Sequence, residues 1–197
     1  MNLQRIKIGF ALTGSHCTIA TVIQQIGKLI AAGAQVTPVV SPTVERENTR
    51  FGRAEEVMEK LATLTGNKPI RSIVEAEHVG PGKLFDLLIV APCTGNTLAK
   101  LANGITDTAV LMAVKAHLRN QRPVLLAIAT NDGLGLNAKN IGVLLATRHI
   151  YLVPFGQDDP SEKPNSLVAR MEFILPAAVE ALQGKQIQPL LMAYKRD

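Results

Sequence analysis

Residues 86–97 read DLLIVAPCTGNT, an unbroken aliphatic run after Asp86 that gives way to a turn of small, mostly polar residues. A run of this kind is typical of a parallel strand covered on both faces, because no position along it is reserved for solvent. Residues 123–129, PVLLAIA, have the same character. The sequence therefore predicts a buried central strand at 86–91, with a polar loop at its carboxyl end.

Outward from this stretch, strand patterns alternate with helical patterns along the whole chain. We expect strands at 5–12, 35–40, 69–74, 86–91, 123–129 and 150–153. We expect helices from about Ile19 to Gly33, at 53–64, from 98, and at 107–120, 137–147 and 166–183. This alternation predicts an α/β protein with a three-layer Rossmann-like fold, a parallel sheet with helices on both faces. One domain is expected (1–197), with an apolar C-terminal tail (184–197) packed against it or against a neighbour.

The composition argues against several classes of protein. Hydrophobic residues make up 47% of the 197 and aromatic residues 4%, so we expect an aliphatic core and some apolar surface in a subunit interface. The net charge of +5 comes from scattered residues, without the basic stripe and aromatics of a nucleic-acid binder. The sequence has no signal-peptide pattern and no apolar stretch near the roughly 20 residues that span a bilayer, so we expect a cytoplasmic protein that does not bind membranes. Cys17 and Cys93 lie far apart, and no His or Cys spacing indicates a metal site.

Three loops that follow predicted strands are rich in Gly, Ser, Thr and Asn: loop 1 (13–18), loop 2 (92–97) and loop 3 (130–137). In parallel sheets ligands bind at the carboxyl ends of the strands, and helix N-termini there bind phosphate. Helix capping alone would also explain these residue types. The patterns Gly-x-Gly-x-x-Gly in loop 1 and Gly-x-x-x-x-Gly-Lys-Ser/Thr anywhere are absent, which favours a mononucleotide cofactor over a dinucleotide or a nucleoside triphosphate.

Residues 90–107, VAPCTGNTLAKLANGITD, resemble the Pro-Ala-Ser-Ala-Asn-Thr block of the homo-oligomeric flavin-containing cysteine decarboxylase family. Gly14 and Ser15 match the phosphate loop of that family, and 129–131 take the place of its Pro-Ala-Met-Asn block. His78 stands eight residues before Asp86, the spacing of the family's active-site histidine. The resemblance implies the flavoprotein fold, bound FMN and a trimer-based homo-oligomer in which His78 serves an adjacent subunit.

The resemblance gives each of these residues an expected role. His78 and Asn131 would be catalytic, although on the residues alone His78 could be a surface histidine and Asn131 could simply shape the turn. Asn96 could contact the flavin, cap the following helix, or do both. The residues expected to bind FMN are Gly14, Ser15, His16, Ser41, Thr94, Gly95, Asn96, Thr97 and Ala129.

Residues 92–97, 130–140 and 153–160 are most similar to one branch of this family. In that branch, the resemblance implies, the chain works with a dehydrogenase-like A chain that binds NAD(P), and together they oxidise a dihydrodipicolinate-type dicarboxylate to dipicolinate in the mother cell of a spore former. Ile128 and Thr130 replace the Pro and Met of the family block, which disfavours cysteine decarboxylation.

Other functions remain open on the sequence alone. An FMN-dependent decarboxylase or flavin prenyltransferase would use the same flavin site, and a non-catalytic chain could simply stabilise the A chain. Arg46, Arg50, Arg53 and Lys163 could bind substrate carboxylates or could be solvated surface residues.

Overall fold

A computed structural model describes residues 2–194 of the chain. Its centre is a parallel sheet in the order β2-β1-β3-β4-β5, in which Ile8 of β1 pairs with both Val36 and Leu87. Two short strands add an antiparallel edge: β7 pairs with the carboxyl end of β4, and β6 pairs with β7. The strands are β1 (Lys7–Leu12), β2 (Gln35–Val40), β3 (Leu87–Cys93), β4 (Val124–Thr130), β5 (Ile150–Leu152), β6 (Phe155–Gly156) and β7 (Leu167–Ala169).

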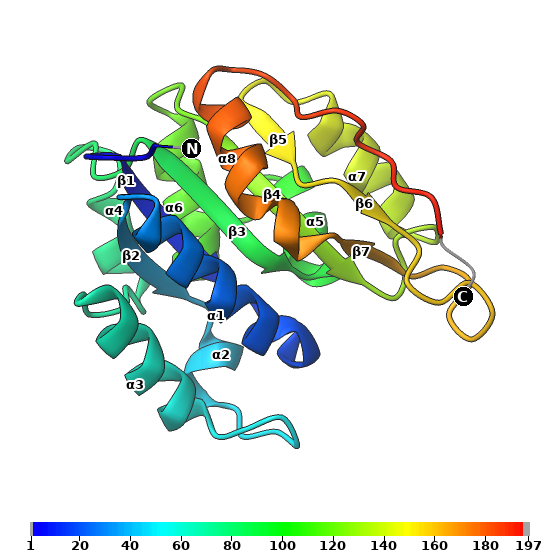
Figure 1. Cartoon of the computed structure of the whole chain (residues 1–197), viewed down its shortest axis with the longest axis horizontal. Coiled ribbons are helices and arrows are strands. Elements are labelled where there is room, and N and C mark those ends of the chain that lie inside the picture. Colours follow the sequence, from blue (N-terminus) through cyan, green and yellow to red (C-terminus); the bar gives the residue numbers. More distant parts are fainter. Residues whose placement is uncertain (1, 195–197) are drawn as a thin grey trace.

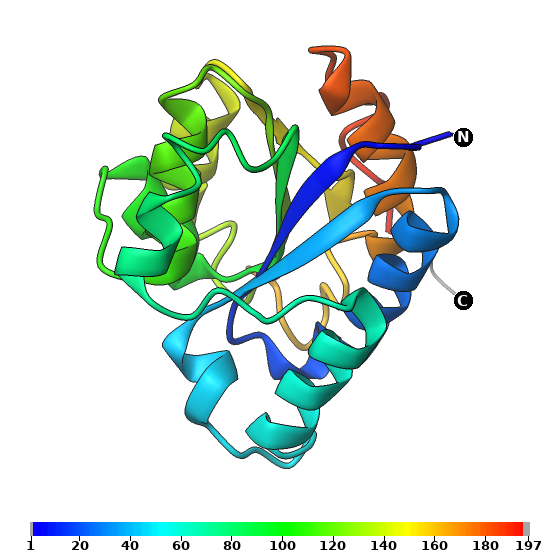
Figure 2. The same ribbon diagram turned by 90° about the vertical axis from the view of Figure 1, so that its left-hand side faces the viewer.

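Helices cover both faces of the sheet, as expected (Figure 2). One layer contains α1 (His16–Ala31), α3 (Ala54–Thr65) and α8 (Ile174–Leu182). The other contains α4 (Ile73–Glu77), α5 (Gly95–Ala102), α6 (Ala109–Leu118) and α7 (Asn137–Leu145). The short α2 (Pro42–Arg46) follows the carboxyl end of β2. The predicted three-layer α/β fold is thus confirmed (Figure 1).

The core is aliphatic because the central strands are buried along nearly their whole length. All seven residues of β3 are buried, as are the first six of β4. From one side α1 adds Ile19, Val22 and Ile26, which recur at the spacing of one helix face. The unbroken aliphatic runs of the sequence therefore mark the strands with helices on both faces.

Two predicted elements differ from the structure. Residues 69–74 form only one bridge to β2, between Ile70 and Val39, before α4 begins. Ser72 and Glu75 form a capping box there: the Ser72 hydroxyl accepts from Glu75 N (3.2 Å), and the Glu75 carboxylate accepts from Ser72 N (3.0 Å). This reciprocal pair starts a helix where β-branched residues indicate a strand.

The predicted helix at 166–183 is also only partly correct. Its first residues form β7, and after the 3-10 turn η1 (Met171–Phe173) the helix α8 starts at Ile174. The carboxyl end of β4 extends beyond β5 and is free to pair with 167–168. Pro176 lies in the first turn of α8, where a missing N–H costs no helical hydrogen bond.

The C-terminal tail packs against the edge of the sheet. The Gln186 side chain donates to Leu152 O (2.7 Å) and accepts from Leu152 N (2.8 Å), and Met192 N donates to Phe155 O (2.9 Å). The expected packing against its own domain is therefore found as far as Met192; 195–197 lie outside the described residues. None of the helices in the described part of the chain has the length and apolarity needed to cross a membrane.

Candidate functional site

Loops 1 and 2 are joined by a buried threonine. The Thr13 hydroxyl donates to Pro92 O (2.6 Å) and accepts from Thr94 N (3.1 Å). Thr13 is only 2% exposed, so these bonds are not shared with solvent. Because β1 and β3 are parallel neighbours, the two loops leave the sheet at the same edge, and Thr13 fixes their relative position.

Loop 2 also lies tightly against loop 3, at Gly95. A Cβ atom on this residue would lie 2.5 Å from Thr130 Oγ1, 2.6 Å from Asn137 Nδ2 and 2.8 Å from Asp132 Oδ1. No ordinary Cβ atom fits at such distances, so a glycine is needed here for contact rather than for an unusual backbone angle. Loops 1, 2 and 3 therefore meet at one rim, as the sequence predicts.

A polar network that the sequence did not predict holds loop 3 in place. The Asp132 carboxylate accepts hydrogen bonds from the Thr130 hydroxyl and from Asn137 Nδ2 (2.9 and 2.8 Å to its two oxygens). The hydrogen bond from Thr130 is the main reason that the pKa of Asp132 is lowered. Asn140 Nδ2 in turn donates to Asn137 Oδ1 (2.8 Å), and both asparagines are buried. The only signal in the sequence is the density of Asn and Asp in and after loop 3.

The helix N-termini at this rim differ in how their N–H groups are satisfied. Thr94 caps α5 by accepting from Thr97 N (3.4 Å), and Ser41 caps α2 by accepting from Val44 N (3.4 Å). Helix α1 has no side-chain cap bond from Ser15 and no acidic residue in its first turn. A long helix with an uncompensated N-terminus attracts an anion. Of these three helix starts, α1 is the one that suits a phosphate group.

The residues predicted to bind FMN fall into two groups by exposure. Gly14, Ser15, His16 and Thr94 are partly accessible, and Asn96 is exposed, so a ligand could reach them. Ser41, Gly95, Thr97 and Ala129 are buried in the chain itself. The hydroxyls of Ser41 and Thr97 already make hydrogen bonds within their helix starts.

The two predicted catalytic residues lie apart. Asn131 is exposed in loop 3, at the rim. His78 is exposed at the C-terminal end of α4, and the turn after it contacts the end of α6, where Asn120 Nδ2 donates to Gly80 O (2.7 Å). Helix α6 ends beside the amino end of β4. Helix α4, which His78 follows, therefore lies at the edge of the sheet opposite the three loops (Figure 1). The chain therefore does not bring its own His78 to its own loops.

Glu75, which lies near His78 in the sequence, bonds to the backbone at the start of α4. The Glu75 carboxylate accepts from Arg71 N (2.9 Å) and Ser72 N (3.0 Å), and these backbone hydrogen bonds, that from Arg71 first, lower its pKa. Its charge is thus used to cap α4, and no hydrogen bond joins it to His78 in the described part of the chain.

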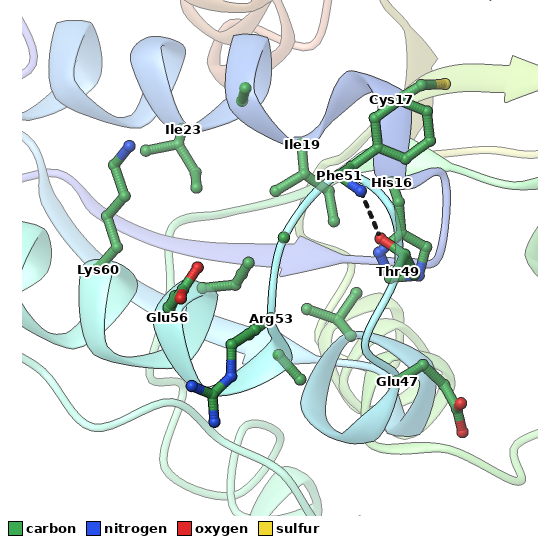
Figure 3. A pocket seen from close by; sticks show the side chains of 15 residues that line it. His16, Cys17, Ile19, Ile23, Glu47, Thr49, Phe51, Arg53, Glu56 and Lys60 are labelled. Carbon is green, nitrogen blue, oxygen red and sulfur yellow. Dashed lines mark hydrogen bonds between the residues drawn. The ribbon is translucent and has the colours of Figure 1, made fainter.

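A pocket of about 230 Å³ opens beside loop 1, between the first turns of α1 and α3 (Figure 3). His16 lines it, and its Nε2 atom is buried without a hydrogen-bond partner among the described residues. Sequence reasoning missed this pocket because its walls come from segments that are distant along the chain.

The remaining candidate side chains are easily placed. Arg46 and Arg53 are exposed and pair with Glu45 (3.3 Å) and Glu55 (3.4 Å), and Lys163 pairs with Asp158 (3.6 Å). The Arg50 guanidinium lies 4.9 Å from the centre of the Phe51 ring. None of these four cations contacts loops 2 or 3 through a hydrogen bond or ion pair among residues 2–194.

The two cysteines differ in their exposure. Cys93 is buried in β3, and burial raises its pKa far above the usual range of a thiol. Cys17 is exposed in the first turn of α1. Residues 2–194 contain no group of three His, Cys, Asp or Glu that could hold a metal ion.

Comparisons with known proteins agree with this architecture. The flavoprotein family model matches residues 1–167. The B subunit of dipicolinate synthase from Bacillus subtilis is 52% identical over 191 residues, which cover 97% of this chain and 96% of that protein. The crystal structure of the corresponding dipicolinate synthase B subunit from Bacillus halodurans matches with a TM-score of 0.91 and 48% identity, over 98% of this chain and 99% of that one.

A more distant match shows how widely the fold is shared. The FMN-dependent cysteine decarboxylase TvaF from thioviridamide biosynthesis gives a TM-score of 0.66 at 21% identity, over 91% of this chain and 99% of that one. At this identity the match concerns the fold alone. From the family model and the two full-length matches, the chain belongs to the flavoprotein family and, within it, to the dipicolinate synthase B subunits.

Proposed function

We propose that the chain binds FMN at the rim of loops 1, 2 and 3 and acts as the B subunit of a dipicolinate synthase in the cytoplasm of the mother cell. The observation that carries this proposal is the N-terminus of α1, with no side-chain cap, no acid in its first turn and a glycine before Ser15. The 52% identity to a dipicolinate synthase B subunit supports the proposed reaction, which is the oxidation of a dihydrodipicolinate-type dicarboxylate.

The residues at the rim fit FMN. Gly14, Ser15 and His16 would hold the phosphate, because the buried Nε2 of His16 has no hydrogen-bond partner among residues 2–194. The exposed amides of Asn96 and Asn131 would orient the flavin and the substrate. Bound FMN would supply an acceptor for a hydride equivalent. The A chain would carry NAD(P), the final acceptor of the electrons.

Oxidation of a dihydropyridine-type ring removes a hydride and a proton, so a base is needed as well. His78 is the proposed base, and its place at the opposite edge of the sheet requires that a second copy of the chain supplies it. The face of α4 beside it exposes Ile73 (36%) and Val74 (68%), which suits a subunit contact. A trimer-based homo-oligomer would repeat this contact around a ring.

A mixing experiment tests this arrangement. The A chain is co-expressed with the H78Q variant, with a Ser15→Asp variant that repels phosphate, or with both together. We expect little dipicolinate from either variant alone and clear recovery from the mixture, because one copy supplies His78 and its neighbour supplies the phosphate loop. Full activity of H78Q alone, in a normal assembly, would instead support a non-catalytic chain that stabilises the A chain.

The requirement for flavin is tested in the same system. Dipicolinate formation by the wild-type pair is measured after removal of flavin and again after FMN is added back. We expect activity to depend on FMN. Equal rates with and without flavin would contradict the proposed cofactor.

A further inference from the structure

The position of His78 depends on its backbone. Its side chain is exposed and makes no hydrogen bond to residues 2–194. Helix α4, which ends just before it, has only five residues and is too short to be stable by itself. Ala76 and Val79, on either side of His78 in the sequence, are fully buried, and α4 packs against α6. The contacts that fix His78 are therefore those of α4 and of the segment that follows it.

Residues 79–85 form the His78 turn, which folds back on the histidine. Gly82 N donates to His78 O (3.0 Å), and Leu84 N donates to Val79 O (3.3 Å). A Cβ atom on Gly82 would lie 2.9 Å from His78 O and 2.8 Å from Leu84 Cδ2, so only a glycine allows so close a turn. A shift of the His78 turn would therefore move the backbone of His78.

Two side chains from the segment between α6 and β4 bind the two ends of the His78 turn. Asn120 Nδ2 donates to Gly80 O (2.7 Å) near its start. Arg122 Nη1 donates to Lys83 O (3.2 Å) and to Phe85 O near its end. Because this segment leads directly into β4, these hydrogen bonds fix the turn relative to the amino end of the sheet.

Arg122 also stabilises an unfavourable backbone conformation. Lys83 has a φ of 44°, in the left-handed region that favours glycine, and such a residue persists only where its surroundings fix it. Arg122 Nη1 lies 3.5 Å from Asp86 Oδ1, and Asp86 Oδ2 accepts from Lys7 N (2.9 Å), so the turn is connected to β1 as well. The planar guanidinium carries several N–H groups in a fixed geometry, which a lysine does not reproduce.

We propose that Asn120 and Arg122 are positioning residues for His78: by fixing the His78 turn, they set where one copy of the chain presents its base to the site of a neighbouring copy. The inference rests on the proposed function, in which His78 acts in a second copy. A general base must come within about 2.6–3.2 Å of the proton that it removes, and a misplacement of about 1 Å can cost on the order of a hundredfold in rate. Loops 1, 2 and 3 lie at the opposite edge of the sheet, so their binding of FMN should not depend on this turn.

The first test measures dipicolinate formation by the A chain assembled with N120A, R122A, R122K or R119A. We expect kcat to fall about tenfold or more in N120A and R122A, while the KM for the dicarboxylate and the affinity for FMN stay within about twofold of the wild type. R122K should recover only part of the loss, because its ammonium lacks the fork of N–H groups. R119A is the matched control: it removes an equal charge from the exposed side chain next to Asn120 and should keep the wild-type kcat.

A mixing experiment separates a positioning role from a general loss of stability. Equal amounts of R122A and Ser15→Asp should give about a quarter of the wild-type rate, because random assembly combines loop 1 of R122A with a well-placed His78 in about a quarter of the sites. R122A mixed with H78Q should show no such recovery, because both variants fail in presenting the base. A chain that is merely unstable would recover with both partners or with neither. N120A loses a single hydrogen bond and provides the same comparison if R122A does not assemble.

The outcomes separate this inference from the proposed function. A wild-type kcat in N120A and R122A, beside an inactive H78Q, would overturn the positioning role and leave His78 as the base. A loss of FMN affinity in both variants as large as the loss of kcat would also overturn it. Full activity of H78Q would overturn His78 as the base and this inference together. A reduced kcat that recovers with Ser15→Asp and not with H78Q would support both.

Discussion

Gly95 offers a sharp test of how the rim is built, through the substitution Gly95→Ala. Alanine in a helix is favoured over glycine by roughly 0.5–1 kcal/mol. Against this, the added methyl would lie 2.5 Å from Thr130 Oγ1 and 2.6 Å from Asn137 Nδ2. Overpacking costs about 1–3 kcal/mol, and moving loop 3 would weaken hydrogen bonds to the ionised Asp132, each worth about 1.5–3 kcal/mol. We therefore expect a net destabilisation of about 1–3 kcal/mol.

The assay is thermal and urea unfolding beside a matched control, Gly142→Ala. Gly142 is also helical, but a Cβ there meets no atom within 4 Å, so this variant should gain roughly 0.5–1 kcal/mol. For a chain of this size each kcal/mol moves Tm by about 2–4 °C, so the two variants should shift Tm in opposite directions. Gly95→Ala should also weaken flavin binding, because Asn131 moves with loop 3. A Gly95→Ala protein as stable as Gly142→Ala would show that loops 2 and 3 are not in this contact.

Three further outcomes are expected. Burial lowers the pKa of His117 to about 4, below the value of about 6.5 in the unfolded chain. The free energy of unfolding should therefore fall by about 3 kcal/mol as the pH falls from 6.5 toward 4. Urea unfolding at pH 7 and pH 4.5 should show a smaller loss of stability in H117Q than in the wild type. Ser15→Asp should add a side-chain cap to α1 and raise the free energy of unfolding by about 0.5–1 kcal/mol, while the affinity for FMN falls at least about tenfold. If stability and FMN affinity both fell, the variant would be misfolded. Thr13→Val leaves Pro92 O and Thr94 N without their buried partner and should lower the free energy of unfolding by about 1–3 kcal/mol. An unchanged Tm would show that the Thr13 hydroxyl does not hold loops 1 and 2 together.

The sheet was predictable because its signal is local. Strands buried on both faces need uninterrupted aliphatic residues, and 86–91 and 123–129 supply them. Residues 167–169 are apolar too, but they become a strand only because β5 leaves the end of β4 unpaired. Nothing near 167 in the sequence carries that information, so a helix was the natural expectation there.

Part of the candidate site could likewise be predicted from local sequence, and part could not. The three loops are marked by small polar residues at strand ends, and their meeting follows from parallel strands. The contact of Gly95 with the Asp132 network and the pocket beside His16 both depend on packing between distant segments. The family resemblance implies that His78 is a catalytic residue, but the sequence gives no sign that it lies at the other edge of the sheet.

The central claim is that the open N-terminus of α1 holds a phosphate monoester, and the most direct measurement compares FMN with riboflavin, which lacks only the phosphate. Both are titrated into the flavin-free chain, and binding is followed by the quenching of flavin fluorescence. Charge-assisted hydrogen bonds worth about 1.5–3 kcal/mol predict that FMN binds roughly tenfold to a hundredfold more tightly than riboflavin. Equal affinities, or no binding of FMN at about 100 μM, a concentration within the usual range of enzyme ligand affinities, would contradict the account.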